Sequence, residues 1–191
     1  LNTTKAIINL NNFEHNIRYM QSIAKKAELY PVIKANAYGH GLNKIAHKIA
    51  DLKLKGVCIA TANELKQLIN LNFDYSILHL GKLSFLDFTL YQHDNVIATI
   101  NTLDDVKKIK KFNNSNKPIR VHIKIDTGMT RMGCDIEEFV EILDCCLKEN
   151  SISLEGVYSH LANSETSNSH YNSQQFAMFK EIINHLKDKS I

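Results

Sequence analysis

The sequence contains no long hydrophobic run. No stretch approaches the ~20 consecutive apolar residues that a membrane-spanning helix needs, and the first residues lack the apolar segment of a secretory signal. An excess of one charge is also lacking, since 23 basic and 20 acidic residues leave a net charge of only +3. Such a balance offers no basic surface for a nucleic acid. We therefore expect neither a membrane nor a nucleic acid as a partner.

Cysteine pairs and several common enzyme motifs are missing as well. The four cysteines form no C-x-x-C pair and no disulfide framework of the secreted type, which favours reduced thiols in the cytoplasm. The sequence has no H-E-x-x-H, no G-x-x-x-x-G-K-[ST], no G-x-G-x-x-G and no G-x-S-x-G. Most of the nine histidines lie in helix or loop patterns without ligand spacing. We therefore expect a cytoplasmic protein without a metal site.

Short apolar segments typical of strands alternate with amphipathic helical patterns along the chain. Such alternation predicts an α/β fold with a parallel sheet and helical crossovers. The predicted strands fall at residues 6–10, 31–34, 56–60, 76–81, 96–100, 119–126 and 154–159. The predicted helices fall at 13–27, from about 42, after Thr61, at 83–91, after Thr102, at 136–147 and after a loop at 163–173.

The number of strand–helix units bears on the architecture. Six units follow the first strand and helix. Five or six strands can complete a doubly wound sheet, whereas a (β/α)8 barrel needs eight units and usually ~250 residues. Spacing alone leaves both architectures open. Because the chain stops where a further strand would begin, we expect it to be a segment of a longer protein.

Polar residues concentrate at the carboxyl ends of the predicted strands, where parallel α/β folds bind ligands. Lys34 follows Val32 and Ile33 and precedes a Tyr-Gly-His-Gly sequence, whose glycines allow a sharp turn close to a ligand. A poorly solvated lysine favours its neutral amine, the form that condenses with a carbonyl compound. Lys34 is therefore a candidate nucleophile, and a surface lysine at a strand end is the alternative.

The predicted strand at 119–126 carries charge on one face. The polar side chains that alternate with apolar ones are Arg120, His122, Lys124 and Asp126. Barrel strands are covered on both faces, and a buried charge is costly unless it is paired. The following turn brings Arg131 toward the same end, and an arginine suits a carboxylate or a phenolate. Both a binding site and a structural salt-bridge network of Lys124, Asp126 and Arg131 are open.

The last predicted strand ends at Tyr158, Ser159 and His160. A lone histidine at a strand end is more often a satisfied core residue than a functional one. Here it joins a lysine and an arginine that follow two other strands. A functional role for His160 and a core role are therefore evenly balanced.

Three segments resemble a known family. V-I-K-A-N-A-Y-G-H-G, residues 32–41, resembles the pyridoxal-phosphate lysine motif of bacterial alanine racemases. K-I-D-T-G-M-T-R-M-G, residues 124–133, resembles their second motif, and Y-S-H-L-A, residues 158–162, their third. The motifs occur in the family's order, and the similarity extends over essentially the whole chain.

The resemblance implies a fold class and an assembly. The fold would be α/β, a (β/α)8 TIM-type barrel of the alanine racemase N-terminal type, with about six of its eight β/α units present. Residues 1–191 would form a partial barrel that binds pyridoxal 5′-phosphate. The final barrel units and a C-terminal β domain would lie outside this chain. The full-length protein would be a cytoplasmic homodimer with composite active sites.

The resemblance also assigns roles to residues. Lys34 would form the Schiff base with pyridoxal 5′-phosphate and act as one of two catalytic bases. Tyr38 would bind the phosphate, Arg131 would approach the phenolic oxygen and the substrate carboxylate, and His160 would pack against the pyridine ring. Lys124 matches a lysine that is often carbamylated in the family. The residues that would line the pocket are Val32 and Leu80.

The implied reaction is the interconversion of L-alanine and D-alanine for peptidoglycan synthesis. Racemisation needs bases on both faces of the substrate carbanion. The family's second base is a tyrosine of the partner subunit, and no residue here matches it, so we expect these 191 residues alone to be inactive. One alternative is a non-racemising pyridoxal-phosphate homeostasis or carrier protein of the same barrel family, and another is a structural domain without a cofactor.

Overall fold

The computed structural model describes residues 4–166 and 169–189. The chain divides into two compact units, residues 1–97 and residues 98–191. Strand β3 (Val96–Ile100) runs from one unit into the other. In both units parallel strands alternate with helices.

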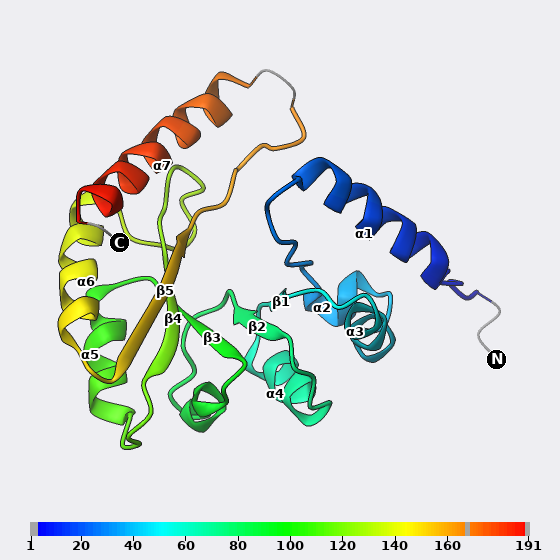
Figure 1. Ribbon diagram of the computed structural model, residues 1–191, viewed down its shortest axis with the longest axis horizontal. Helices are drawn as coiled ribbons and strands as arrows, with labels where there is room; N and C mark the ends of the chain where they lie inside the picture. The colour runs from blue at the N-terminus through cyan, green and yellow to red at the C-terminus, as the bar shows by residue number, and fades with distance from the viewer. Residues whose placement is uncertain (1–3, 167–168, 190–191) are drawn as a thin grey trace. The chain divides into compact units, whose positions relative to one another are not determined.

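The first unit is built around two short buried strands. β1 (Gly56–Ile59) pairs in parallel with β2 (Ser76–His79) along its whole length, and β2 pairs in parallel with the start of β3. The core of this sheet includes Cys58, Leu78 and Ile97. The helices of the unit, coloured blue to green in Figure 1, are α1 (Leu10–Ala24), α2 (Lys34–Tyr38), α3 (Leu42–Asp51), α4 (Ala62–Asn70) and the 3-10 helix η1 (Phe88–Gln92).

The second unit continues the same pattern. β4 (Ile119–Lys124) pairs in parallel with the end of β3 and with β5 (Ile152–Tyr158), with an irregular register at Val121 and His122. The helices of this unit are α5 (Leu103–Phe112), α6 (Ile136–Lys148) and α7 (His170–Asp188). Figure 1 shows α5 and α6 on one side of β4 and β5, where α5 packs against α6 and α6 packs against β5.

The described strands pair in the order β1-β2-β3-β4-β5, and all pairs are parallel. A connection between parallel neighbours must cross over the sheet, and here each crossover contains a helix. The predicted α/β alternation is therefore confirmed. In the described ranges, no helix combines the length and the apolar character that crossing a bilayer requires.

Two helices begin where their sequence signals predict. Thr61 accepts a hydrogen bond from the backbone of Glu64, which in turn caps the backbone N–H of Thr61 at the start of α4. Thr102 and Asp105 form the same capping box at the start of α5. These caps satisfy N–H groups that the first turn of a helix leaves without an internal partner.

The N-terminal prediction was wrong. Residues 4–9 contain no strand, and the helix predicted at 13–27 begins earlier, at Leu10, and ends at Ala24. The side chain of Asn9 explains the early start, because it accepts hydrogen bonds from the backbone N–H groups of Asn11 and Asn12.

Three further elements differ from the prediction by more than a few residues at one end. The strand expected at 31–34 is a single parallel bridge between Val32 and Cys58. The helix expected at 83–91 is reduced to η1. The Tyr91 hydroxyl of η1 accepts a hydrogen bond from the backbone N–H of Ser84, which precedes it. The loop expected at 163–173 ends early because Ser169 caps α7, although residues 167–168 lie outside the described ranges.

Candidate functional site

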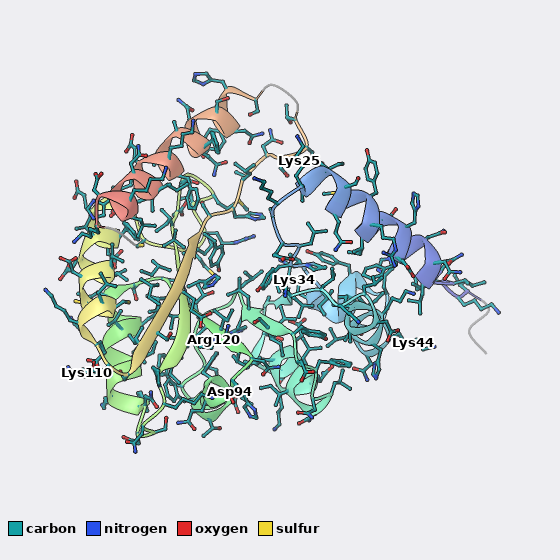
Figure 2. The ribbon with its side chains drawn as sticks, in the orientation of Figure 1. Lys25, Lys34, Lys44, Asp94, Lys110 and Arg120 are labelled. Atoms are coloured by element: carbon teal, nitrogen blue, oxygen red, sulfur yellow. The ribbon has the colours of Figure 1, made fainter. Side chains whose placement is uncertain are left out.

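Lys34 lies at the carboxyl end of a segment that extends the first sheet. The backbone of Cys58 accepts the N–H of Ile33 at 2.9 Å and donates its own N–H to Pro31 at 2.9 Å. This pairing makes residues 31–33 a neighbour of β1. Lys34, which is labelled in Figure 2, is half-buried and is the first residue of α2. The structure therefore places Lys34 at the end of the sheet where parallel folds bind ligands.

The backbone after Lys34 forms a left-handed turn. Ala35, Asn36 and Ala37 have φ values of 52°, 56° and 53°, with ψ between 44° and 50°, and Tyr38 has a φ of 52°. For residues with a Cβ atom this conformation costs about 1–2 kcal/mol each, so the turn exists only because other contacts hold it. Gly39, at a φ of 85°, ends the turn without that penalty.

Hydrogen bonds on both sides stabilise this turn. Within it, Ala37 donates its N–H to Ile33 at 2.9 Å, and Gly39 donates to Ala35 at 3.1 Å. The Asn36 side-chain oxygen accepts the N–H of Leu42, the first residue of α3, at 2.8 Å. The turn and the start of α3 are therefore fixed together.

Glu64 connects this turn to the end of β1. One carboxylate oxygen accepts the N–H of Ala35 at 2.6 Å, and the other accepts the N–H groups of Ala60 and Thr61, each at 3.0 Å. Burial disfavours the charged form, but these backbone donors outweigh it and lower the pKa of Glu64 below its usual value. The capping role of Glu64 follows from its spacing to Thr61, whereas its contact with Ala35 lies 29 residues away and has no sequence signal.

Three more candidate residues belong to the first unit. Val32 pairs with Cys58, and Leu80 donates its N–H to Ile59 at 2.8 Å, so both flank the carboxyl end of β1. Leu80 also packs against the core of the sheet. The side chain of Tyr38 is exposed. Lys34, Tyr38, Val32 and Leu80 thus gather at one end of this unit's sheet.

Lys124, on β4, is a buried lysine. Its side chain is 4% exposed, and its Nζ has no hydrogen-bond partner among the described residues. The Nζ lies 5.7 Å from the centre of the Tyr158 ring. Burial lowers the pKa of Lys124, which favours a neutral amine. The amine therefore has unused hydrogen-bonding capacity inside the protein.

The proposed salt-bridge network does not form. In the described part of the chain, neither Lys124 nor Arg131 makes an ion pair with Asp126. Asp126 instead accepts the backbone N–H groups of Gly128 at 2.8 Å and Thr130 at 3.0 Å. Burial opposes its ionisation, yet these donors lower the pKa of Asp126. Asp126 thus shapes the loop, and Arg131 on this loop is exposed.

The loop that carries Arg131 returns to β4. Asp126 donates its N–H to Cys134 at 2.8 Å, and Cys134 donates its N–H to Lys124 at 3.0 Å. Gly133, at a φ of 111°, makes this return, and a Cβ there would lie 2.8 Å from the backbone nitrogen of Asp126. The loop is therefore fixed at both ends beside Lys124.

His160 lies at the end of β5, where a buried glutamine holds the backbone. His160 is exposed, so its side chain is not a core histidine. Gln175, on α7, is 1% exposed and donates to the His160 carbonyl at 3.0 Å and to the Thr127 hydroxyl at 3.1 Å. Its side-chain oxygen accepts the N–H of Ala162 at 2.8 Å. Sequence reasoning missed Gln175, because a glutamine on a helix is ordinarily exposed.

His79 belongs to the structural histidines. It is 1% exposed, its Nε2 donates to the Ala60 carbonyl at 3.1 Å, and its Nδ1 accepts from the Tyr91 hydroxyl at 3.0 Å. Burial lowers the pKa of His79. The described residues contain no cluster of three or more potential metal ligands.

Comparisons with known proteins identify the family and confirm the fold. Residues 8–191 match the family model described as alanine racemase, N-terminal domain. The chain is 34% identical over 196 residues to the alanine racemase of Carboxydothermus hydrogenoformans, covering 97% of this chain and 50% of that protein. It is 32% identical over 177 residues to the alanine racemase of Listeria monocytogenes, covering 91% and 47%. The chain spans about half the length of these curated relatives.

Solved structures show the same relationship. The alanine racemase of Clostridium difficile 630 is similar with a TM-score of 0.88 at 28% identity, over 96% of this chain and 49% of that one. Its complex with cycloserine is similar with a TM-score of 0.89. These similarities confirm the expected fold, an incomplete (β/α) barrel of the alanine racemase N-terminal type. Since the family model covers nearly the whole sequence, this chain belongs to the alanine racemase N-terminal domain family.

Proposed function

We propose that this chain is the cofactor-binding part of a pyridoxal 5′-phosphate-dependent alanine racemase. The observation that carries the proposal is the position of Lys34. This half-buried residue lies at the carboxyl end of the segment paired with β1, directly before the left-handed turn. This is the end of a parallel sheet where ligands bind. Family membership supports the same function.

The candidate residues near the carboxyl ends of the strands have the chemistry that pyridoxal 5′-phosphate requires. An aldehyde needs a primary amine, a phosphate needs hydrogen-bond donors, and a phenolic oxygen suits a guanidinium group. Lys34 would hold the aldehyde carbon, and the exposed Tyr38 would donate to the phosphate. Arg131 would bind the phenolic oxygen and the substrate carboxylate, and His160 would pack against the pyridine ring. The residues proposed to line the pocket are Val32 and Leu80.

Lys124 adds an observation of its own. Its buried Nζ lacks a hydrogen-bond partner among the described residues, which is costly unless something else satisfies it. We propose that the Lys124 amine, in its neutral form, takes up CO2 and loses a proton, which gives a carbamate. The product would be an anion within electrostatic range of Arg131. It would then help to orient the guanidinium group.

The reaction assigns a task to each side chain. When bound, the cofactor supplies an electron sink that makes the Cα–H of the amino acid acidic. The Lys34 amine would remove or return this proton on one face of Cα. Arg131 would hold the substrate through its carboxylate. A base on the opposite face would come from the C-terminal domain of a partner subunit, as the family resemblance implies.

The cellular setting follows from the proposed reaction. The substrate would be alanine, and the D-alanine product would serve peptidoglycan synthesis in the cell wall. We further propose that residues 1–191 act as a partial barrel domain of a cytoplasmic homodimer. Composite sites of this kind depend on both subunits, so we expect this chain alone to bind the cofactor but not to racemise alanine.

The test is cofactor capture by Lys34. Wild-type protein, Lys34→Ala and the control Lys44→Ala are incubated with pyridoxal 5′-phosphate, reduced with borohydride and mapped by peptide mass spectrometry. Lys44 is an exposed residue of α3 in the same unit, as Figure 2 shows. We expect a visible absorption band and labelling at Lys34 in the wild type and in Lys44→Ala, and loss of both in Lys34→Ala.

Two results would contradict the proposal. Equal labelling of Lys34→Ala would remove Lys34 from the site. Capture at Lys34 without alanine racemisation, in a longer form of the protein that includes a C-terminal domain, would favour a non-racemising carrier.

A further inference from the structure

The carboxylate of Glu64 accepts hydrogen bonds from two separate segments of the first unit. Its bonds to Ala60 and Thr61 belong to the cap of α4. Its 2.6 Å bond to Ala35 reaches the residue directly after Lys34. A cap alone does not require this third bond, so Glu64 does more than begin a helix.

The next capping box in the chain is a natural comparison. Asp105 accepts the N–H groups of Asn101 at 2.9 Å and Thr102 at 3.1 Å, as Glu64 does for Ala60 and Thr61. One of its oxygens makes both bonds. An aspartate therefore suffices to cap a helix of this fold, and the longer side chain of Glu64 supplies the additional reach.

The contact is placed where the turn most needs support. Ala35 is the first of four consecutive non-glycine residues with positive φ. The backbone N–H of Ala35 donates to the Glu64 carboxylate. A hydrogen bond to a charged acceptor is stronger than one to a neutral acceptor. Losing the bond would release the turn at the residue next to Lys34.

We propose that Glu64 is a positioning residue, whose carboxylate holds the Ala35 N–H and thereby directs the Lys34 amine toward an aldehyde. The proposal rests on the proposed function for its second half, since that function makes Lys34 the acceptor of pyridoxal 5′-phosphate. The first half, the anchoring of Ala35, concerns the protein without cofactor. The two halves have separate measurements.

The decisive variant is Glu64→Asp. It keeps the charge and, as Asp105 shows, can still cap a helix, but it is one methylene too short to hold both segments. Glu64→Gln is the second variant, which keeps the length and removes the charge. Asp105→Asn is the control, because it weakens the cap of another helix, α5, without touching Ala35.

Two readouts follow each variant in the longest form of the protein that can be expressed. Amide hydrogen exchange of Ala35 is measured by NMR without cofactor, and labelling of Lys34 is measured with pyridoxal 5′-phosphate and borohydride. We expect Glu64→Asp and Glu64→Gln to speed exchange at Ala35 and to slow labelling of Lys34 by about tenfold or more, the effect of a lost bond to a charged acceptor. Asp105→Asn should leave both unchanged.

The outcomes separate the anchor from the cofactor. Unchanged exchange at Ala35 in Glu64→Asp, with a folded protein, would overturn the anchoring role. Faster exchange with unchanged labelling of Lys34 would overturn the positioning role. If the wild type itself is not labelled at Lys34, the proposed function fails, and the exchange rate of Ala35 then decides the anchoring role by itself.

Discussion

Replacing Gln175 tests whether the ends of β4 and β5 depend on one buried amide. Gln175→Ala removes the two bonds that the amide donates to Thr127 and His160 and the one it accepts from Ala162. Three bonds at about 1 kcal/mol each, with about 1 kcal/mol for the buried methylene, predict a loss of about 4 kcal/mol in the free energy of unfolding. The site is 1% exposed, so solvent does not reach it in the folded state.

Urea unfolding at pH 7, followed by circular dichroism, measures this change. The neighbouring Gln174 is exposed, and Gln174→Ala should change the unfolding free energy by no more than about 0.5 kcal/mol. Gln175→Glu keeps the shape but aims a second acceptor at the His160 carbonyl, so it should be at least as damaging as the alanine. A loss for Gln175→Ala within about 0.5 kcal/mol of the Gln174→Ala control would refute this reasoning.

Three further predictions concern stability. Gly133→Ala should lower the unfolding free energy by about 2 kcal/mol or more in the same urea assay, because its φ is 111° and its Cβ would meet backbone atoms of Asp126 and Lys124 at 2.8 and 2.9 Å. Thr102→Ala should cost about 1 kcal/mol through the cap of α5, measured by thermal melting. Burial lowers the pKa of His79 in the folded protein, whereas the unfolded histidine takes up a proton at about pH 6.5. The free energy of unfolding should therefore fall as the pH drops from about 7 to about 5. His79→Gln should flatten that fall, and an equally steep profile in the variant would contradict the assignment.

The sequence predicts those features that depend on local patterns. Thr61 and Thr102 mark helix starts because a hydroxyl and a carboxylate three residues later satisfy free N–H groups. The alternation along β4 correctly separates the buried Val121 and Ile123 from the polar face that carries Lys124. Both patterns act over a few residues, which is why they can be read without the fold.

Features that depend on distant contacts could not be predicted. Ala35, Ala37 and Tyr38 have no preference for left-handed backbone, and the glutamate that holds the turn comes from a later helix. On α7 the apolar Phe176 is 57% exposed, whereas its polar neighbour Gln175 is buried. In each case the tertiary partners, and not the residue's own preference, decide its surroundings.

The left-handed turn has a consequence for protein engineering. A designer who copied residues 32–41 onto another scaffold would transfer the lysine without the carboxylate that holds its neighbour. The ten-residue segment carries Lys34, but its left-handed backbone depends on the rest of the fold, since the stabilising oxygen comes from Glu64. A successful transplant must therefore include both pieces, at a fixed separation and with the hydrogen bond intact.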